Sequence, residues 1–174
     1  MKKTNSMASV EMPRGLSLSP SQDQLINQIL SDLLEKCPAQ LILLSELSGQ
    51  IISVQGETGK TDLAALGALV AGDLAASQEI ARLTGQYQHA QLIFREGPET
   101  TSFITEAGDR MVLYMRIHKE VPLGWARLII LESNRKLAEV ASMPAVNEEK
   151  LDLQLNDENL ENLIGDGLDS IWHE

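Results

Sequence analysis

Two segments that are apolar on both faces restrict the fold of this chain more than any other feature. They are residues 40–46 (QLILLSE) and 111–117, within RMVLYMRIH. A strand with one solvated face alternates apolar and polar side chains, whereas a strand that is apolar on both faces has to be covered on both. We therefore expect these two strands in the middle of a sheet, with helices packed on both of its faces.

The remaining patterns predict three helices and five strands. Leucines and isoleucines at helical spacing predict a first helix over 19–36, with Ser21 as its N-cap and Pro38 ending it. Short turns join the strands at 40–46 and 50–55, and, after the long helix, those at 89–96, 100–106 and 110–118. Such hairpin connections predict a mostly antiparallel sheet, in which strand 50–55 lies nearer an edge and strand 89–96 lies at one. A last helix is expected from Leu123 to about Ser142.

These patterns predict one α+β domain over residues 21–142. The Ser-, Pro- and Gly-containing residues 1–20 are expected to form a flexible leader. The domain would be followed by an acidic C-terminal tail over 143–174. An unpaired edge strand at 89–96 would allow two copies to pair edge to edge across a two-fold axis, so we expect a homodimer.

The long helix predicted from Thr61, its cap, to Leu83, with Gly85 as C-terminal cap, is unusual because it is apolar almost all round. A stripe expected to face the sheet holds Leu63, Leu66, Val70 and Leu74. A second stripe holds the small residues Ala64, Ala68, Ala71, Gly72 and Ala75. Glycine inside a helix costs up to about 1 kcal/mol relative to alanine, so Gly67 and Gly72 need a reason. Tight packing on the domain's own sheet and contact with another molecule both supply one.

Charge and cysteine content exclude several classes of partner and site. The net charge is −11, of which residues 144–174 carry −8 and residues 1–143 only −3. Nucleic acids and anionic membranes require basic patches, so neither is expected as a partner. Cys37 is the single cysteine, which excludes an internal disulfide. No membrane span and no signal peptide is expected, and these features together predict a soluble, cytoplasmic protein.

Catalytic and cofactor motifs are absent or incomplete. The segment SVQGETGKTDLAAL ends in Gly59-Lys60-Thr61 like a phosphate-binding loop, but Val54 stands where that motif requires its first glycine. Its preceding strand also belongs to a hairpin, so we interpret the segment as a glycine-rich loop. His89, His118 and His173 form no metal-binding pair, and Cys37 has no histidine near it in the sequence. We therefore expect a binding module without catalytic, cofactor or metal sites.

Several segments resemble the roadblock/dynein light chain family over residues 21–142, and in particular its bacterial MglB-type regulators of a Ras-like small GTPase. The segments are LAALGALVAGDLAASQEIARLTG, LIFREG and VPLGWARLIILES, with AGDLAA at 71–76 and LGWARL at 123–128 as their most specific parts. The resemblance implies a profilin-like α/β/α sandwich with one helix on one face and two on the other. It also implies a dimer formed through the long helix and an edge strand.

The resemblance further implies that a GTP-loaded small GTPase binds across the paired long helices, and that the protein supplies no catalytic residue. The implied GTPase contacts are Ala64, Ala68, Leu69, Gly72, Asp73 and Ala76. The implied dimer contacts are Ala65, Ala71, Gln91, Ile93 and Arg95. Two functions stay open: a regulator that stimulates GTP hydrolysis or only binds the GTP form, and a roadblock scaffold subunit of a larger assembly.

The acidic tail combines apolar side chains at helical spacing with a tryptophan near its end. These side chains are Leu160, Leu163, Ile164, Ile171 and Trp172. Apolar anchors in an acidic segment are typical of a short helix that binds in a groove, so we expect them to dock on a partner. A solvated tail that only adds solubility is the alternative.

Overall fold

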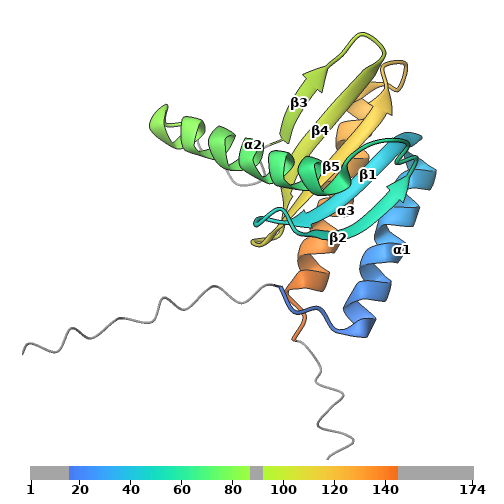
Figure 1. Cartoon of the computed structure of the whole chain (residues 1–174), viewed down its shortest axis with the longest axis vertical. Helices are drawn as coiled ribbons and strands as arrows, with labels where there is room; N and C mark the ends of the chain where they lie inside the picture. The colour runs from blue at the N-terminus through green and yellow to red at the C-terminus, as the bar shows by residue number, and fades with distance from the viewer. Residues whose placement is uncertain (1–15, 87–91, 145–174) are drawn as a thin grey trace, which may run out of the picture. The chain divides into compact units, whose positions relative to one another are not determined.

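The computed structural model describes residues 16–86 and 92–144, and in these residues the predicted alternation of three helices and five strands is confirmed (Figure 1). The elements follow in the order α1 (Pro20–Lys36), β1 (Ala39–Glu46), β2 (Ile51–Gly56), α2 (Leu63–Leu83), β3 (Leu92–Glu96), β4 (Thr100–Ala107), β5 (Met111–His118) and α3 (Leu123–Ala141). Gly85, with φ of +69°, follows the end of α2 as predicted.

The five strands form one sheet in the order β2-β1-β5-β4-β3, and each neighbouring pair is antiparallel. The two strands that are apolar on both faces, β1 and β5, pair with each other, and Ile42 lies opposite Met115. Strands β2 and β3 form the two edges of the sheet. The antiparallel sheet and the inner and edge positions of these strands are therefore confirmed.

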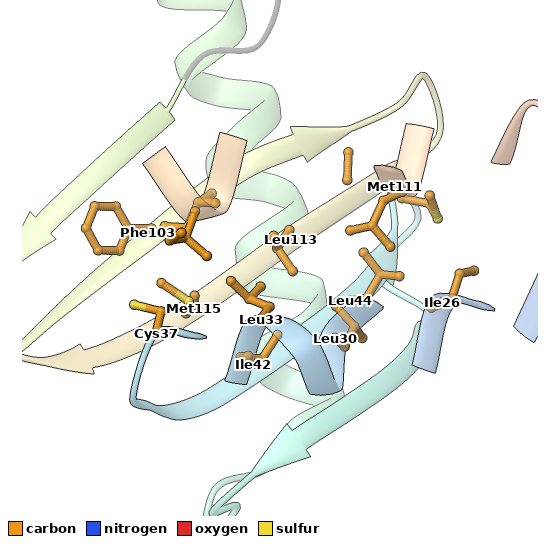
Figure 2. Close-up of a cluster of buried hydrophobic side chains, with 14 of the residues drawn as sticks. Ile26, Leu30, Leu33, Cys37, Ile42, Leu44, Phe103, Met111, Leu113 and Met115 are labelled. Atoms are coloured by element: carbon orange, nitrogen blue, oxygen red, sulfur yellow. The ribbon is translucent and has the colours of Figure 1, made fainter. Parts of the chain in front are cut away.

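Alternate side chains of β5 divide the core into two layers. Leu113 and Met115 belong to a large cluster with α1 and α3 (Figure 2), whereas Val112 and Tyr114 belong to a smaller cluster under α2. Side chains two apart on a strand point to the same face, so these clusters lie on opposite faces of the sheet. The sheet thus carries α1 and α3 on one face and α2 on the other.

The N-caps of two helices differ from the predicted ones. Ser19, not Ser21, caps α1: its Oγ accepts from the backbone N–H of Gln22, and the Gln22 side chain accepts from the N–H of Ser19. Proline at the first position, Pro20, suits a helix that begins there. Asp62, not Thr61, caps α2, because its carboxylate accepts from the N–H of Ala65 at 3.1 Å.

Residues 16–20, which the sequence assigned to a flexible leader, are held against the domain. The backbone N–H of Leu16 donates to Glu46 Oε1 at 2.9 Å, and Leu16 and Leu18 pack against the large cluster. The side chain of Gln22 donates to the carbonyl of Val140 at 2.9 Å, which joins the start of α1 to the end of α3. The packed domain therefore begins before the expected boundary at residue 20.

Helix α2 is long and apolar enough to cross a membrane by length and composition alone, with a mean hydropathy of 1.3. From the sequence, by contrast, no segment that could span a membrane was expected. Only 22% of that stretch is buried within the described residues, although its buried side chains pack on the sheet. Most of this apolar helix is therefore left uncovered by its own domain.

Candidate functional site

Helix α2 packs on the sheet through a narrow stripe. Val70 and Leu74 are buried against Ile104 and Val112 of the sheet, and Leu66 packs beside them. The predicted orientation of these three residues of α2 is confirmed, while Leu63 is only partly buried. Gly67, Ala71 and Ala81 are buried as well, and the opposite side of the helix faces away from the core.

The opposite side of α2 exposes apolar residues along its whole length, and we call it the outer face. Its exposed members are Ala64, Ala65, Ala68, Leu69, Gly72, Ala75, Ala76, Ile80 and Leu83. Leu69 and Leu83 each expose 71% of their surface and Ile80 exposes 62%. The charged side chains among them, Glu79 and Arg82, form an ion pair with each other. A contiguous apolar surface of this kind is typical of a protein–protein contact.

The two glycines inside α2 have different explanations. A Cβ on Gly67 would lie 2.6 Å from the carbonyl oxygen of Gly49, in the β1–β2 turn, so Gly67 allows close packing within the domain. Gly49 itself has φ of +88°, and a Cβ there would lie 2.7 Å from the Cα of Ala68. Around Gly72, by contrast, no atom of residues 16–86 and 92–144 lies within 4 Å of an added Cβ. Intramolecular packing thus explains Gly67 and leaves Gly72 without an internal reason.

Five of the six predicted GTPase contacts lie together on the outer face. Asp73 is different, because its side chain is only 18% exposed and its Oδ1 accepts from Arg95 of β3 at 2.6 Å. An ion pair this close to solvent adds little stability, at most about 1 kcal/mol. It does join the edge strand β3 to the long helix α2 at this point.

The predicted dimer contacts are divided between surface and core. Ala65 is exposed on the outer face, and Arg95 is exposed on β3. Ala71 exposes only 5% of its surface, so little of it could contact a partner. Ile93 packs in the small cluster under α2. Gln91 lies outside the described residues. Within these residues β3 pairs with β4 alone, so its other edge is unpaired.

The predicted tail-docking residues cannot be placed against this surface. They all lie outside the described residues: Leu160, Leu163, Ile164, Ile171 and Trp172. Their docking on a partner stays a prediction.

The sheet brings Arg95, a predicted dimer contact, into line with Arg116, which sequence reasoning assigned to no site. Arg95 lies opposite Ser102 on β4, and Ser102 lies opposite Arg116 on β5. Directly opposed residues share a face of the sheet, so these three side chains form a row across β3, β4 and β5, which we call the arginine row. The sequence does indicate that Tyr114 and Arg116 share one face of their strand, because they alternate in RMVLYMRIH. Nothing in the sequence indicates the register that brings Arg116 into line with β3.

The pKa of Tyr114 depends on the charges of the arginine row. Burial raises the pKa of the Tyr114 phenol, and the positive charges of Arg116 and Arg95 partly offset this by favouring the phenolate. We expect Arg116→Gln to raise the pKa of Tyr114 further, because it removes the charge with the larger effect of the two. Ultraviolet titration of tyrosinate in a Tyr87→Phe background, which leaves Tyr114 as the single tyrosine, measures this. Arg127→Gln on α3 is the control, and a lowered or unchanged pKa in Arg116→Gln contradicts the placement.

The loop that resembles a phosphate-binding loop sits in the wrong context for one. It follows β2, an edge strand paired antiparallel to β1, and leads into α2 through the Asp62 cap. Cys37 is fully buried, and burial raises the pKa of its thiol. Among the described residues no three His, Cys, Asp or Glu side chains gather as metal ligands would.

An open pocket of about 640 Å³ lies where β5 ends and α3 begins. Its lining residues are Pro38, His118, Glu120, Val121, Pro122 and Trp125. Nε2 of His118 lies 2.8 Å from the amide nitrogen of Gln40, and the indole of Trp125 donates to the carbonyl of Lys36 at 3.3 Å. Most of these lining residues are apolar, so the pocket has few groups that could take part in a reaction.

Comparison with known proteins relates this architecture to solved structures. No family model and no curated protein matches the sequence. Myxococcus xanthus MglB is 29% identical, with a TM-score of 0.66, over 72% of this chain and 93% of that one. The gliding protein MglB of Thermus thermophilus is 24% identical, with a TM-score of 0.66, over 75% of this chain and 98% of that one. A roadblock/LC7 domain from Streptomyces avermitilis is 17% identical, with a TM-score of 0.51, over 66% of this chain and 89% of that one.

Proposed function

Because this chain is a roadblock-family protein that resembles MglB, we propose that it regulates a Ras-like small GTPase by binding the GTP form. The observation that carries this proposal is the outer face of α2. It is apolar from Ala64 to Leu83 and has no partner within the described residues. A helix that is apolar nearly all round is normally buried on both sides, so this face needs a second protein.

The chemistry of the outer face indicates binding and not catalysis. Alanine, glycine, leucine and isoleucine supply no acid, base or nucleophile, and Glu79 and Arg82 pair with each other. Any effect of the outer face on hydrolysis would therefore act through the GTPase's own groups. A regulator of this kind favours one order of the GTPase's switch segments, and it shifts that equilibrium only by its difference in affinity for the two states.

A homodimer is part of the proposal. The unpaired edge of β3 lies beside α2, and the ion pair between Arg95 and Asp73 joins the strand to the helix. An exposed strand edge is a template for pairing with a second copy, and pairing across a two-fold axis would bring two α2 helices together. The two outer faces would then form one larger surface for the GTPase.

The test combines binding and turnover. The full chain is mixed with a Ras-like GTPase from the same genome, loaded either with a non-hydrolysable GTP analogue or with GDP, and the mixture is analysed by size exclusion with light scattering. We expect a complex with the GTP analogue only, containing two copies of this chain. Absence of a complex in both nucleotide states would contradict the proposal.

GTP turnover then separates regulation from scaffolding. A regulator that orders the switch segments raises the single-turnover rate of the GTPase. Binding without any change in that rate would instead favour the scaffold subunit, in which the same surface recruits the GTPase to a larger assembly.

A further inference from the structure

The arginine row (Arg95, Ser102 and Arg116) crosses three strands on the side of the sheet that α2 occupies. Adjacent strands lie about 4.8 Å apart, which places the backbones of the two arginines about 10 Å from each other with Ser102 between them. Helix α2 covers the neighbouring positions of the same strands, where Ile93, Ile104 and Tyr114 pack beneath it. In Figure 1 the parts of β3, β4 and β5 nearest the β3–β4 hairpin are clear of α2.

The two arginines differ in their partners. Arg95 donates to Asp73, whereas the side chain of Arg116 forms no hydrogen bond or ion pair with another described residue. Nε of Arg116 is buried and has no acceptor in the part of the chain that the structure describes. A buried donor without an acceptor is costly, and the cost is greater for a charged group. The side chain of Arg116 is only partly buried, so a carboxylate from another molecule would have to approach the Nη groups, which can bind it through two parallel N–H groups.

The arginine row adjoins the outer face of α2. Asp73 follows Leu69 by four residues and precedes Ala76 by three, so these three side chains are neighbours on the helix surface. Leu69 and Ala76 belong to the outer face, and Asp73 holds Arg95. A protein that covers Leu69 and Ala76 therefore reaches the edge of the arginine row without a gap.

We propose that the arginine row receives an acidic side chain of the GTPase that binds the outer face of α2. This inference rests on the proposed function and adds a charged anchor to an otherwise apolar surface. The apolar contacts supply area, while the arginines select the orientation in which an acidic residue of the GTPase lies over β4. Such a charge pair also speeds association and makes it depend on salt.

Arg116→Gln tests the anchor in the full chain. We expect the affinity for the GTPase loaded with the GTP analogue to fall on the order of 30-fold, with a weaker dependence on salt, because the carboxylate of the GTPase loses its partner. Arg135→Gln is the matched control: it removes one arginine from α3, on the other face, where Arg135 pairs with Glu139. Its affinity is expected to stay at the wild-type value.

Ser102→Asp tests the same site without removing an arginine. Its carboxylate would stand between Arg95 and Arg116 and occupy them from within the chain, so we expect weaker GTPase binding with no loss of thermal stability. Should one variant fold poorly, the other still decides the question.

Several outcomes overturn the inference while leaving the proposed function intact. One is unchanged GTPase affinity in both variants when Ala68→Arg abolishes the complex. A second is a changed molar mass of free Arg116→Gln, which would assign the row to a contact between copies of this chain. A third is Arg116-dependent binding of inorganic phosphate to the free protein that does not compete with the GTPase. Absence of any complex with the wild-type chain overturns the proposed function and this inference together.

Discussion

Replacing Ala68 with arginine abolishes the nucleotide-dependent complex with the GTPase, by our expectation a loss of more than about 100-fold in affinity, or about 3 kcal/mol. Ala68 is exposed near the middle of the outer face, between Ala64 and Gly72 on the helix surface. A partner that packs closely on these small side chains would have to bury a long cationic one. Isothermal titration with the GTP-analogue-loaded GTPase measures the effect.

The control places the same side chain on the other side of the molecule. Gln28 is exposed on α1, so Gln28→Arg adds an equal charge without touching the outer face. Both variants are expected to keep the circular dichroism spectrum and the molar mass of the wild type. If Ala68→Arg is folded and dimeric and still binds with unchanged affinity, the outer face is not the binding surface.

One substitution at two glycines of the same helix is expected to change stability in opposite directions. Gly67→Ala places a methyl group 2.6 Å from the carbonyl oxygen of Gly49, a backbone atom that cannot move aside without shifting the β1–β2 turn. Overpacking of this kind costs about 1–3 kcal/mol, and the gain in helix propensity offsets only part of it. Gly72→Ala meets no atom of the described residues within 4 Å and is expected to gain up to about 1 kcal/mol.

Thermal unfolding of the two variants measures this difference at one protein concentration. The expected shift in Tm is about 2–4 °C for each kcal/mol in a chain of this length, downward for Gly67→Ala and upward for Gly72→Ala. A similar gain in both variants would mean that the helix does not pack against the β1–β2 turn as described. A loss in Gly72→Ala that grows with protein concentration would indicate that its Cβ meets a second copy.

Much of the fold followed from patterns within short stretches of the sequence. The double apolar character of 40–46 and 111–117 was enough to place β1 and β5 inside the sheet, because both of their faces had to be covered. The N-cap residues of α1 and α2 were harder to predict from the sequence. Ser19 and Ser21 are both suitable, as are Thr61 and Asp62, and the choice depends on which side chain reaches an open N–H of the first turn.

For the candidate site, the sequence by itself indicated most of the residues of α2 that face outward, because helical period is a property of consecutive residues, although Ala71 of the predicted second stripe is buried. Only the tertiary structure decided that Gly67 packs on a turn while Gly72 is open, and that Asp73 is held by Arg95. Only the strand register brought Arg95, Ser102 and Arg116 into one row. The physical reason is the same in each case: these contacts join segments far apart in the chain, and their spacing is set by packing and backbone pairing that no local pattern records.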